Sequence, residues 1–322
     1  MASPDWSNLP KDHTLSKFAD ELPSVLQDAD YNEMYGVELS PPAEDKPAPH
    51  TTLIILQKFL RANLNDVPKA RQQLLDALKW RKSYNPLASK DEVFDASKFA
   101  TLGYVTTIKG VKDTPSEEDV AVFNIYGAAA KDPKKTFGDT DAFVRWRVAL
   151  MELTIERLGL GEADKVIPDY GQGPDPYQAI QVHDYLSVSF FRQPAEVKAS
   201  SSKIIDMFQK YVHPPFLRVS TSLHRHRYYP ETVSYKYFVN VPLVMQWMMG
   251  TMKLLMSKDS IQKMTWLTYG SQLHNYVGDD VPREYGGNSA PLARKAQTPS
   301  YGDLEKAASG GVMAAGEPAG EA

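Results

Sequence analysis

The residues with the most distinctive chemistry are a histidine and a tyrosine two positions apart, His183 and Tyr185. They lie in the segment 180–191, which has the pattern of a β-strand, so their rings should project to the same side within about 7 Å of each other. Imidazole and phenolate both bind haem iron, and tyrosinate suits ferric iron. The pair could equally be hydrogen-bonded inside a core, because buried polar groups need partners. These residues alone leave both interpretations open.

The same segment has one face that is polar throughout, namely Gln181, His183, Tyr185, Ser187 and Ser189. The opposite face is apolar except at Asp184, with Val182, Leu186, Val188 and Phe190. A strand in a sheet covered by helices is expected to be apolar on both faces. The polar face is therefore either satisfied by internal partners or lines a cavity.

Two cations and a further tyrosine could accompany an anionic ligand. Arg147 lies beside the apolar face of a helix expected over 139–160, where an arginine either snorkels to solvent or holds an anion. Lys236 lies inside a strand expected over 235–241, either buried with an anionic partner or reaching solvent from an edge strand. Tyr126 ends the first expected strand and could be an ordinary aromatic at a sheet edge. Nearby cations matter because a free tyrosine has a pKa of about 10, so phenolate needs stabilisation.

Composition narrows the class of protein. The 322 residues fit one large domain or two small ones, with 42% hydrophobic residues, 24% charged residues and a net charge of −4. That balance disfavours a nucleic-acid-binding protein. The absence of cysteine excludes disulfides, iron–sulfur clusters and cysteine nucleophiles. Residues 1–20 lack a basic segment followed by an apolar run, which predicts no signal peptide, and no uninterrupted apolar stretch approaches the length of a membrane span.

Motifs of common enzymes are missing. The sequence contains no Gly-x-Ser-x-Gly elbow, no phosphate loop and no Gly-x-Gly-x-x-Gly. His224 and His226 flank Arg225 in a basic segment without carboxylates, which argues against a metal site there. Asp279 and Asp280 follow a glycine and are more typical of a solvated turn. No nucleophile with its base and orienting group emerges, so the sequence predicts no enzyme.

Periodicity predicts helices first and then alternating strands and helices. Helices are expected over 52–60 and 67–80, the second with Asp66 as cap and Pro68 in its first turn. Strands are then expected over 120–126, 180–191, 235–241 and 262–269, with helices over 139–160, 200–211 and 243–255. This order predicts an α/β protein with a mostly parallel sheet covered by helices. Both ends of the chain, including the proline-rich stretch 40–50 and the residues after 289, are expected to lack structure.

Several sequence strings carry a family resemblance. The body from Leu53 to Gly287 resembles the CRAL-TRIO lipid-binding fold of fungal phosphatidylinositol-transfer proteins. Five strings carry this resemblance: FLRAN at 59–63, KWRK at 79–82, YPE at 229–231, FVNVP at 238–242 and YGG at 285–287. Within that family, YNEMYG at 31–36, WRKSYNPL at 80–87, NIYG at 124–127 and QVHDY at 181–185 are similar to the branch that binds haem b, which is that of the fifth homologue of the yeast transfer protein.

The resemblance implies a domain layout. It places an N-terminal segment at 1–50, a small helical lobe at 51–92, a lipid- and haem-binding domain at 93–288 and a disordered tail at 289–322. The sheet of that domain would form the floor of an apolar pocket, and residues 243–255 are similar to the family's gate helix, which opens at the membrane. Residues 212–227 interrupt the pattern and are expected to be an insertion, either a loop extension or a translated intron.

The resemblance also implies roles for single residues. Tyr185 matches the axial ligand of ferric haem b and His183 its neighbour, while Tyr126, Arg147 and Lys236 match further haem contacts. Glu231, Ser260 and Lys263 match the phosphoinositide headgroup site, with Glu231 toward the sugar hydroxyls and the other two toward the phosphate. Where the family has a basic residue, or a tyrosine in the haem branch, this chain has Asn63.

Taken together, the resemblance implies a haem-binding phosphatidylinositol transfer protein that is not an enzyme. It would be cytoplasmic, with transient peripheral association with the endoplasmic reticulum or microsomal membrane, and would act in phosphoinositide homeostasis and the response to oxidants. The alternative is a phosphatidylinositol exchange protein without haem. An enzyme using the pocket is a third hypothesis, for which the sequence supplies no motif.

Overall fold

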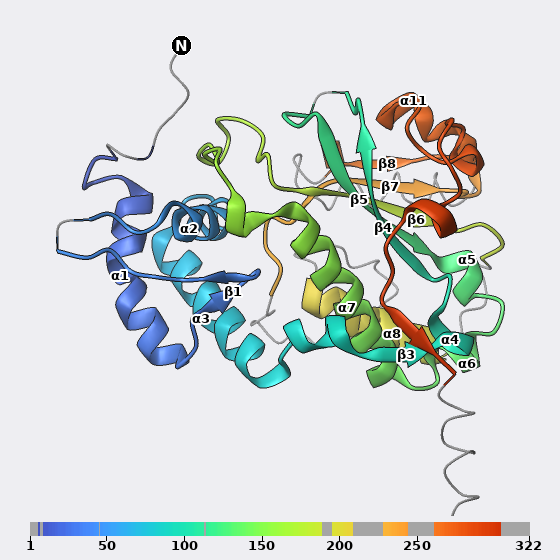
Figure 1. Cartoon of the computed structure of the whole chain (residues 1–322), viewed down its shortest axis with the longest axis horizontal. Helices are drawn as coiled ribbons and strands as arrows, with labels where there is room; N and C mark the ends of the chain where they lie inside the picture. The colour runs from blue at the N-terminus through green and yellow to red at the C-terminus, as the bar shows by residue number, and fades with distance from the viewer. Residues whose placement is uncertain are drawn as a thin grey trace, which may run out of the picture.

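Helices gather at one side of the molecule and a twisted sheet at the other, with one long helix between them (Figure 1). The structure is a computed structural model, and it describes residues 6, 9–44, 46–112, 114–188, 195–208, 228–243 and 261–303. The α/β class and the mostly parallel sheet expected from the sequence are both confirmed.

Three helices form the helical lobe: α1 (Thr14–Ala29), α2 (His50–Ala62) and α3 (Val67–Tyr84). The expectation that the N-terminal region lacks structure is wrong for α1. Leu15, Phe18, Leu22 and Val25 recur at three- and four-residue spacing and are fully buried against α2 and α3. This spacing predicts an amphipathic helix, and burial of its apolar face stabilises it. A short hairpin follows α1, formed by β1 (Glu33–Met34) and β2 (Val37–Glu38).

Helix α3 begins as the sequence predicts. The Asp66 carboxylate accepts a hydrogen bond from the Lys69 backbone N–H at 3.0 Å, and Pro68 lies in the first turn. Without a cap, that N–H would have no partner within the helix.

We expect Asp66→Ala to lower the free energy of unfolding by about 1 kcal/mol, because the N-terminal N–H groups of α3 lose their acceptor. Urea denaturation of the two proteins measures this. Lys69→Ala is the control, since it removes only the exposed side-chain ion pair with Asp66 and keeps the cap. Equal losses in both variants would contradict the capping role.

The main sheet has five strands in the order β4–β5–β6–β7–β8. They are β4 (Gly103–Lys109), β5 (Glu118–Ile125), β6 (Ala179–Asp184), β7 (Val233–Val239) and β8 (Met264–Trp266). The strands from β5 to β8 are parallel, and β4, which the sequence analysis missed, pairs antiparallel with β5.

Two expected strands are shorter than predicted. Strand β6 ends at Asp184 rather than at 191, because the Asp184 carboxylate accepts a hydrogen bond from the Leu186 N–H and Ser187 takes a positive φ of 66°. Tyr185 therefore lies just after the strand, and Ser187 is exposed rather than on a buried polar face. The strand expected over 262–269 is confined to β8.

Helices cover both faces of the sheet. Helix α7 (Thr140–Leu158) packs Phe143, Trp146 and Leu150 against the β4–β5 part of one face. Helix α8 (Ala195–Phe208) contacts α7 and α6. Short C-terminal elements cover the other face: η5 (Gly270–Gln272), α11 (His274–Val277), η6 (Arg283–Tyr285) and α12 (Leu292–Lys295). The connections contain η2 (Leu87–Asp91), α4 (Ala96–Phe99), α5 (Tyr126–Ala129), α6 (Pro133–Phe137) and η3 (Leu160–Glu162).

The chain after 289 is ordered as far as residue 303, which corrects the expected tail boundary. Strand β9 (Ser300–Gly302) pairs in parallel with β3 (Val93–Asp95), and Trp146 donates a hydrogen bond to the Tyr301 hydroxyl. Gln297 exchanges two backbone hydrogen bonds with Val105 of β4. The remainder of the expected tail, the expected insertion at 212–227 and the expected gate helix beyond Leu243 lie outside the described residues.

Candidate functional site

The strand register aligns a row of side chains on the face of the sheet where α7 packs. Asn124, His183, Phe238 and Trp266 are direct partners across β5, β6, β7 and β8. Side chains repeat every two residues on one face of a strand. Gln181 and Lys236, which form a second aligned pair two residues earlier, therefore share this face.

Three rings of this row, His183, Phe238 and Trp266, form an aromatic wall together with Tyr126 and Tyr185. We use the term aromatic wall for these five residues. The centroid of His183 lies 5.7 Å from Tyr126 and 5.0 Å from Phe238, and Phe238 lies 5.4 Å from Trp266. Tyr185 stacks between Tyr126, at 5.1 Å, and Phe238, at 6.3 Å. The structure thus brings Tyr126 together with His183 and Tyr185, which the sequence singles out as a pair. Aromatic pairs at these separations contribute to stability beyond the area that they bury.

His183 is buried in this wall, with 4% of its surface exposed. Neither ring nitrogen has a hydrogen-bond partner among the residues that the structure describes. The interpretation of His183 and Tyr185 as a hydrogen-bonded core pair therefore has no support in these contacts. Burial, together with the positive charges of Lys236 and Arg147, lowers the pKa of His183 well below its usual value. The imidazole is neutral at pH 7 and can offer a nitrogen lone pair.

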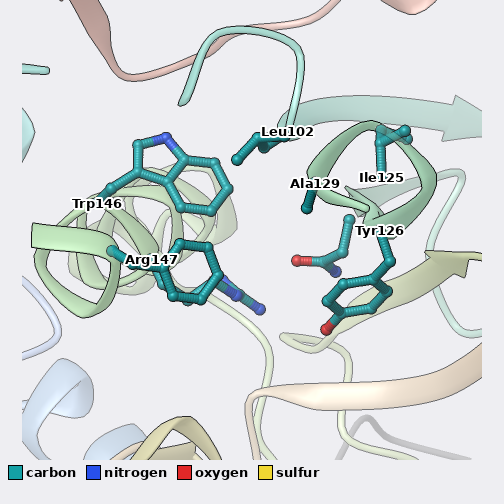
Figure 2. A pocket seen from close by; sticks show the side chains of 8 residues that line it. Leu102, Ile125, Tyr126, Ala129, Trp146 and Arg147 are labelled. Atoms are coloured by element: carbon teal, nitrogen blue, oxygen red, sulfur yellow. The ribbon is translucent and has the colours of Figure 1, made fainter. Parts of the chain in front are cut away.

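Arg147 brings a positive charge to the edge of the wall. Its guanidinium projects from α7 toward Tyr126 across a pocket (Figure 2). That pocket is lined by Leu102, Asn124, Ile125, Tyr126, Ala129, Phe143, Trp146 and Arg147. Only 5% of Arg147 is exposed, and arginine keeps its charge even when buried. Burial raises the pKa of Tyr126, and the charge of Arg147 opposes that rise.

Tyr185 and Tyr126 are neutral phenols in the absence of a ligand. Burial, with a smaller effect of Tyr126, raises the pKa of Tyr185. A phenolate at residue 185 therefore requires a cation that compensates for the lost hydration.

Lys236 is half-buried on β7 beside Gln181. Burial and the nearby charges of Arg147 and Lys263 lower its pKa to about 8. Three cations thus lie close enough to repel one another at this end of the wall. An anion placed among them would relieve both the repulsion and the cost of burial.

This depressed pKa predicts a pH dependence of stability. Between pH 8 and the usual lysine pKa, Lys236 is protonated in the unfolded chain but mostly deprotonated in the folded chain. The free energy of unfolding therefore increases as the pH rises through this window. We expect Lys236→Met to be more stable than the ligand-free parent at pH 7 by on the order of 1 kcal/mol, with the difference shrinking toward pH 10. Urea denaturation at several pH values measures it, and a difference that does not change with pH would contradict the prediction.

The residues assigned to a lipid headgroup have different surroundings. The Glu231 carboxylate accepts a hydrogen bond from Gln178 at 3.0 Å and lies 3.7 Å from the Arg61 guanidinium, so it already has partners. Lys263 precedes β8, and its carbonyl accepts the Lys236 N–H at 2.7 Å, which places the two lysines on neighbouring chains. Ser260 lies outside the described residues.

Asn63 has a structural role in the helical lobe. Its amide donates to the Phe59 carbonyl and to the Gln73 side chain, and it caps the C-terminus of α2.

Two features missed by the sequence analysis complete the site. Phe238 and Trp266 supply two of the five rings of the aromatic wall, but only the pairing register aligns them with His183. Asp184, which interrupts the apolar face of the segment, accepts three hydrogen bonds behind the wall.

Among the other residues considered from the sequence, those that the structure describes form no metal site. Within the described ranges, no group of three or more histidine, aspartate or glutamate side chains could hold a metal ion, and no helix is long and apolar enough to cross a membrane. His224 and His226 lie outside those ranges. Asp280, expected in a solvated turn, accepts from the Lys109 N–H, Ser289 and Lys295.

Comparison with known proteins first defines the class. Residues 128–287 match the CRAL/TRIO domain. The phosphatidylinositol transfer protein SFH5 of Phaeosphaeria nodorum is 47% identical over 294 residues, covering 91% of this chain and 82% of that protein. The corresponding protein of Botryotinia fuckeliana is 45% identical over 282 residues, covering 86% of this chain and 58% of that protein. A crystal structure of Sfh5 superposes with a TM-score of 0.68 at 28% identity, over 96% of this chain and 99% of the other.

The sheet, the helical cover and these similarities define a CRAL/TRIO protein. The chain belongs to the fungal SFH5 family of that fold. The family resemblance inferred from the sequence strings is confirmed.

Proposed function

We propose that this chain transfers phosphatidylinositol and binds ferric haem b at the aromatic wall. The relatives' shared name, phosphatidylinositol transfer protein, supports the lipid activity. The observation that carries the haem assignment is the buried His183, whose two ring nitrogens lack described partners among stacked rings and cations. A polar atom buried without a partner costs free energy, so a ligand that engages it is favoured.

The stacked rings and the nearby cations support haem binding at this wall. Tyr185 would supply the axial oxygen, with His183 beside it, and Tyr126 and Phe238 would pack against the macrocycle. Arg147 and Lys236 would neutralise propionates and favour the phenolate form of Tyr185. When bound, haem would supply iron that responds to oxidants. The chain's own residues would hold the haem, exclude water from it and balance its charge. We propose no enzymatic reaction.

Phosphatidylinositol would approach the same group of cations. Lys263 and Lys236 would face its phosphate, and the partly exposed Glu231 its sugar hydroxyls. We propose that Ser260 completes this headgroup site. Exchange of so apolar a ligand requires a transient peripheral visit to a membrane, which we assign to the endoplasmic reticulum or microsomes from a cytoplasmic pool. The alternative is an exchange protein that carries no haem. In that case Lys236 and Lys263 would serve only to bind the lipid phosphate.

An absorption spectrum tests the haem assignment. The purified chain, supplied with ferric haem, should show a bound-haem spectrum with a tyrosinate-to-iron charge-transfer band. A colourless protein after haem is supplied would reject the haem part of the proposal and favour the haem-free alternative.

Vesicle assays test the lipid part. We expect Lys263→Ala to weaken phosphatidylinositol binding roughly tenfold and to slow transfer between vesicles, because a charge-assisted contact to phosphate is lost. Lys295→Ala is the control, since that lysine pairs with Asp280 in a distant turn. Unchanged transfer by Lys263→Ala would count against the headgroup assignment.

A further inference from the structure

Behind the aromatic wall, a network of hydrogen bonds joins the carboxyl ends of three neighbouring strands. The Asp184 Oδ1 atom accepts from the Leu186 N–H at 2.9 Å and from the Asn240 amide at 2.7 Å. Its Oδ2 atom accepts from the Tyr285 hydroxyl at 2.9 Å. The Asn240 side-chain oxygen in turn accepts from the Gly270 N–H at 2.7 Å. We call Asp184, Asn240 and Tyr285 the strand-end clamp.

The clamp acts on the backbone that carries Tyr185. The bond from the Leu186 N–H closes a tight turn around Tyr185, and the Tyr185 N–H donates to the Val239 carbonyl at 3.1 Å. On the other side, a Cβ atom at Gly127 would lie 1.9 Å from the Leu186 carbonyl oxygen, so α5 presses directly on this turn. The turn is thus held from both sides.

This turn, together with stacking on Tyr126 and Phe238, fixes the direction of the Tyr185 phenol. Strand β6 ends at Asp184, and the sheet ladder holds the Tyr185 N–H while the turn holds the backbone that follows it. Asp184 points away from the wall, whereas His183 and Tyr185 join it. The carboxylate is 6% exposed and has three donors, as a buried anion requires.

We propose that Asp184 is a positioning residue that holds the Tyr185 phenol in the aromatic wall, with Asn240 and Tyr285 fixing its carboxylate. The functional part of this inference rests on the proposed role of Tyr185 as a ligand. The geometric part concerns the ligand-free chain and is tested separately.

The first test uses the ligand-free protein. Incorporated 3-fluorotyrosine gives a fluorine resonance for residue 185, assigned by its absence in Tyr185→Phe. Asp184→Ala should shift or split this resonance, whereas Asp184→Asn, which keeps an acceptor for the Leu186 N–H, should restore it. A resonance that stays unchanged in Asp184→Ala would overturn the inference.

Asp95→Ala is the matched control. Asp95 is buried to a similar degree, with 7% exposed, and its carboxylate accepts from the Ser97 N–H at 2.9 Å in the same kind of turn. This variant should leave the resonance of residue 185 in place. If Asp184→Ala does not fold, Asn240→Gly provides the test instead. Glycine tolerates the positive φ of 59° at residue 240, so this change removes only the Asn240 side chain from the clamp. It should displace the same resonance, and an unchanged resonance would overturn the inference.

The second test adds ferric haem. Asp184→Ala should still bind haem through the remaining wall but lose the tyrosinate charge-transfer band, and Asp184→Asn should recover it. Retention of the full band by Asp184→Ala would overturn the positioning role. If the parent protein binds no haem while the fluorine resonance still moves, the proposed haem function fails and the role of the clamp stands.

Discussion

Tyr185→Phe should abolish the tyrosinate-to-iron charge-transfer band of the haem-loaded protein and weaken haem binding by roughly 100-fold or more. Loss of an outer partner of a metal ligand already costs about 10- to 100-fold in metal affinity, and this change removes the ligand oxygen itself. The phenyl ring keeps its stacking on Tyr126 and Phe238, so the fold should be unaffected. Absorption spectra and haem titration measure both effects.

Tyr126→Phe is the matched control for this experiment. Its ring stacks on both His183 and Tyr185, but the proposed ligand oxygen belongs to Tyr185. The Tyr126→Phe protein should retain the charge-transfer band. An unchanged spectrum in Tyr185→Phe, or loss of the band only in Tyr126→Phe, would show that the axial ligand has been assigned to the wrong residue.

Replacing Arg81 with methionine should lower the free energy of unfolding by about 3–5 kcal/mol. The Arg81 side chain is fully buried and donates to Glu33 and to Glu152, and Glu152 also accepts from the Tyr229 hydroxyl. This network joins α3 of the helical lobe to α7 beside the sheet. Without the guanidinium, Glu152 would be a buried anion that lacks its countercharge, which is why the loss is large. Urea denaturation measures it.

Lys82→Met is the control for Arg81→Met, because Lys82 is the next residue of the same helix and pairs with the exposed Asp30. An exposed pair contributes at most about 1 kcal/mol. Similar losses in both variants would contradict the view that burial makes the Arg81 network important.

Local sequence patterns predicted much of the fold. The Asp66 cap and apolar spacing located α3, apolar spacing located α7 within a few residues, and the alternation of strands and helices indicated the parallel pairing of β5 to β8. Helix α1 carries an equally clear apolar periodicity, but the polar composition of the N-terminal region obscured it. Strand β4 was missed because its pairing with β5 is antiparallel and departs from the repeating order.

The candidate site was predictable only in part. His183 and Tyr185 stood out because two polar rings follow one another at strand spacing, and Arg147 because it borders an apolar helix face. The contributions of Phe238 and Trp266 depend on register, which pairs His183 with Phe238 and Phe238 with Trp266 across long stretches of chain and leaves no local signal. The end of β6 depends on one hydrogen bond that the Asp184 carboxylate accepts from the Leu186 N–H, which competes with the strand ladder and has no periodic signature.

The contact between Gln297 and β4 has a consequence for how the protein behaves in concentrated solution. Strand β4 forms one outer border of the sheet, and a border with free N–H and C=O groups is a template on which a second molecule can add a strand. Gln297 occupies these groups at Val105, and the chain then continues to its pairing with β3. The segment therefore guards the protein against self-association and aggregation, and shortening the chain ahead of Gln297 would remove that protection while leaving the aromatic wall intact.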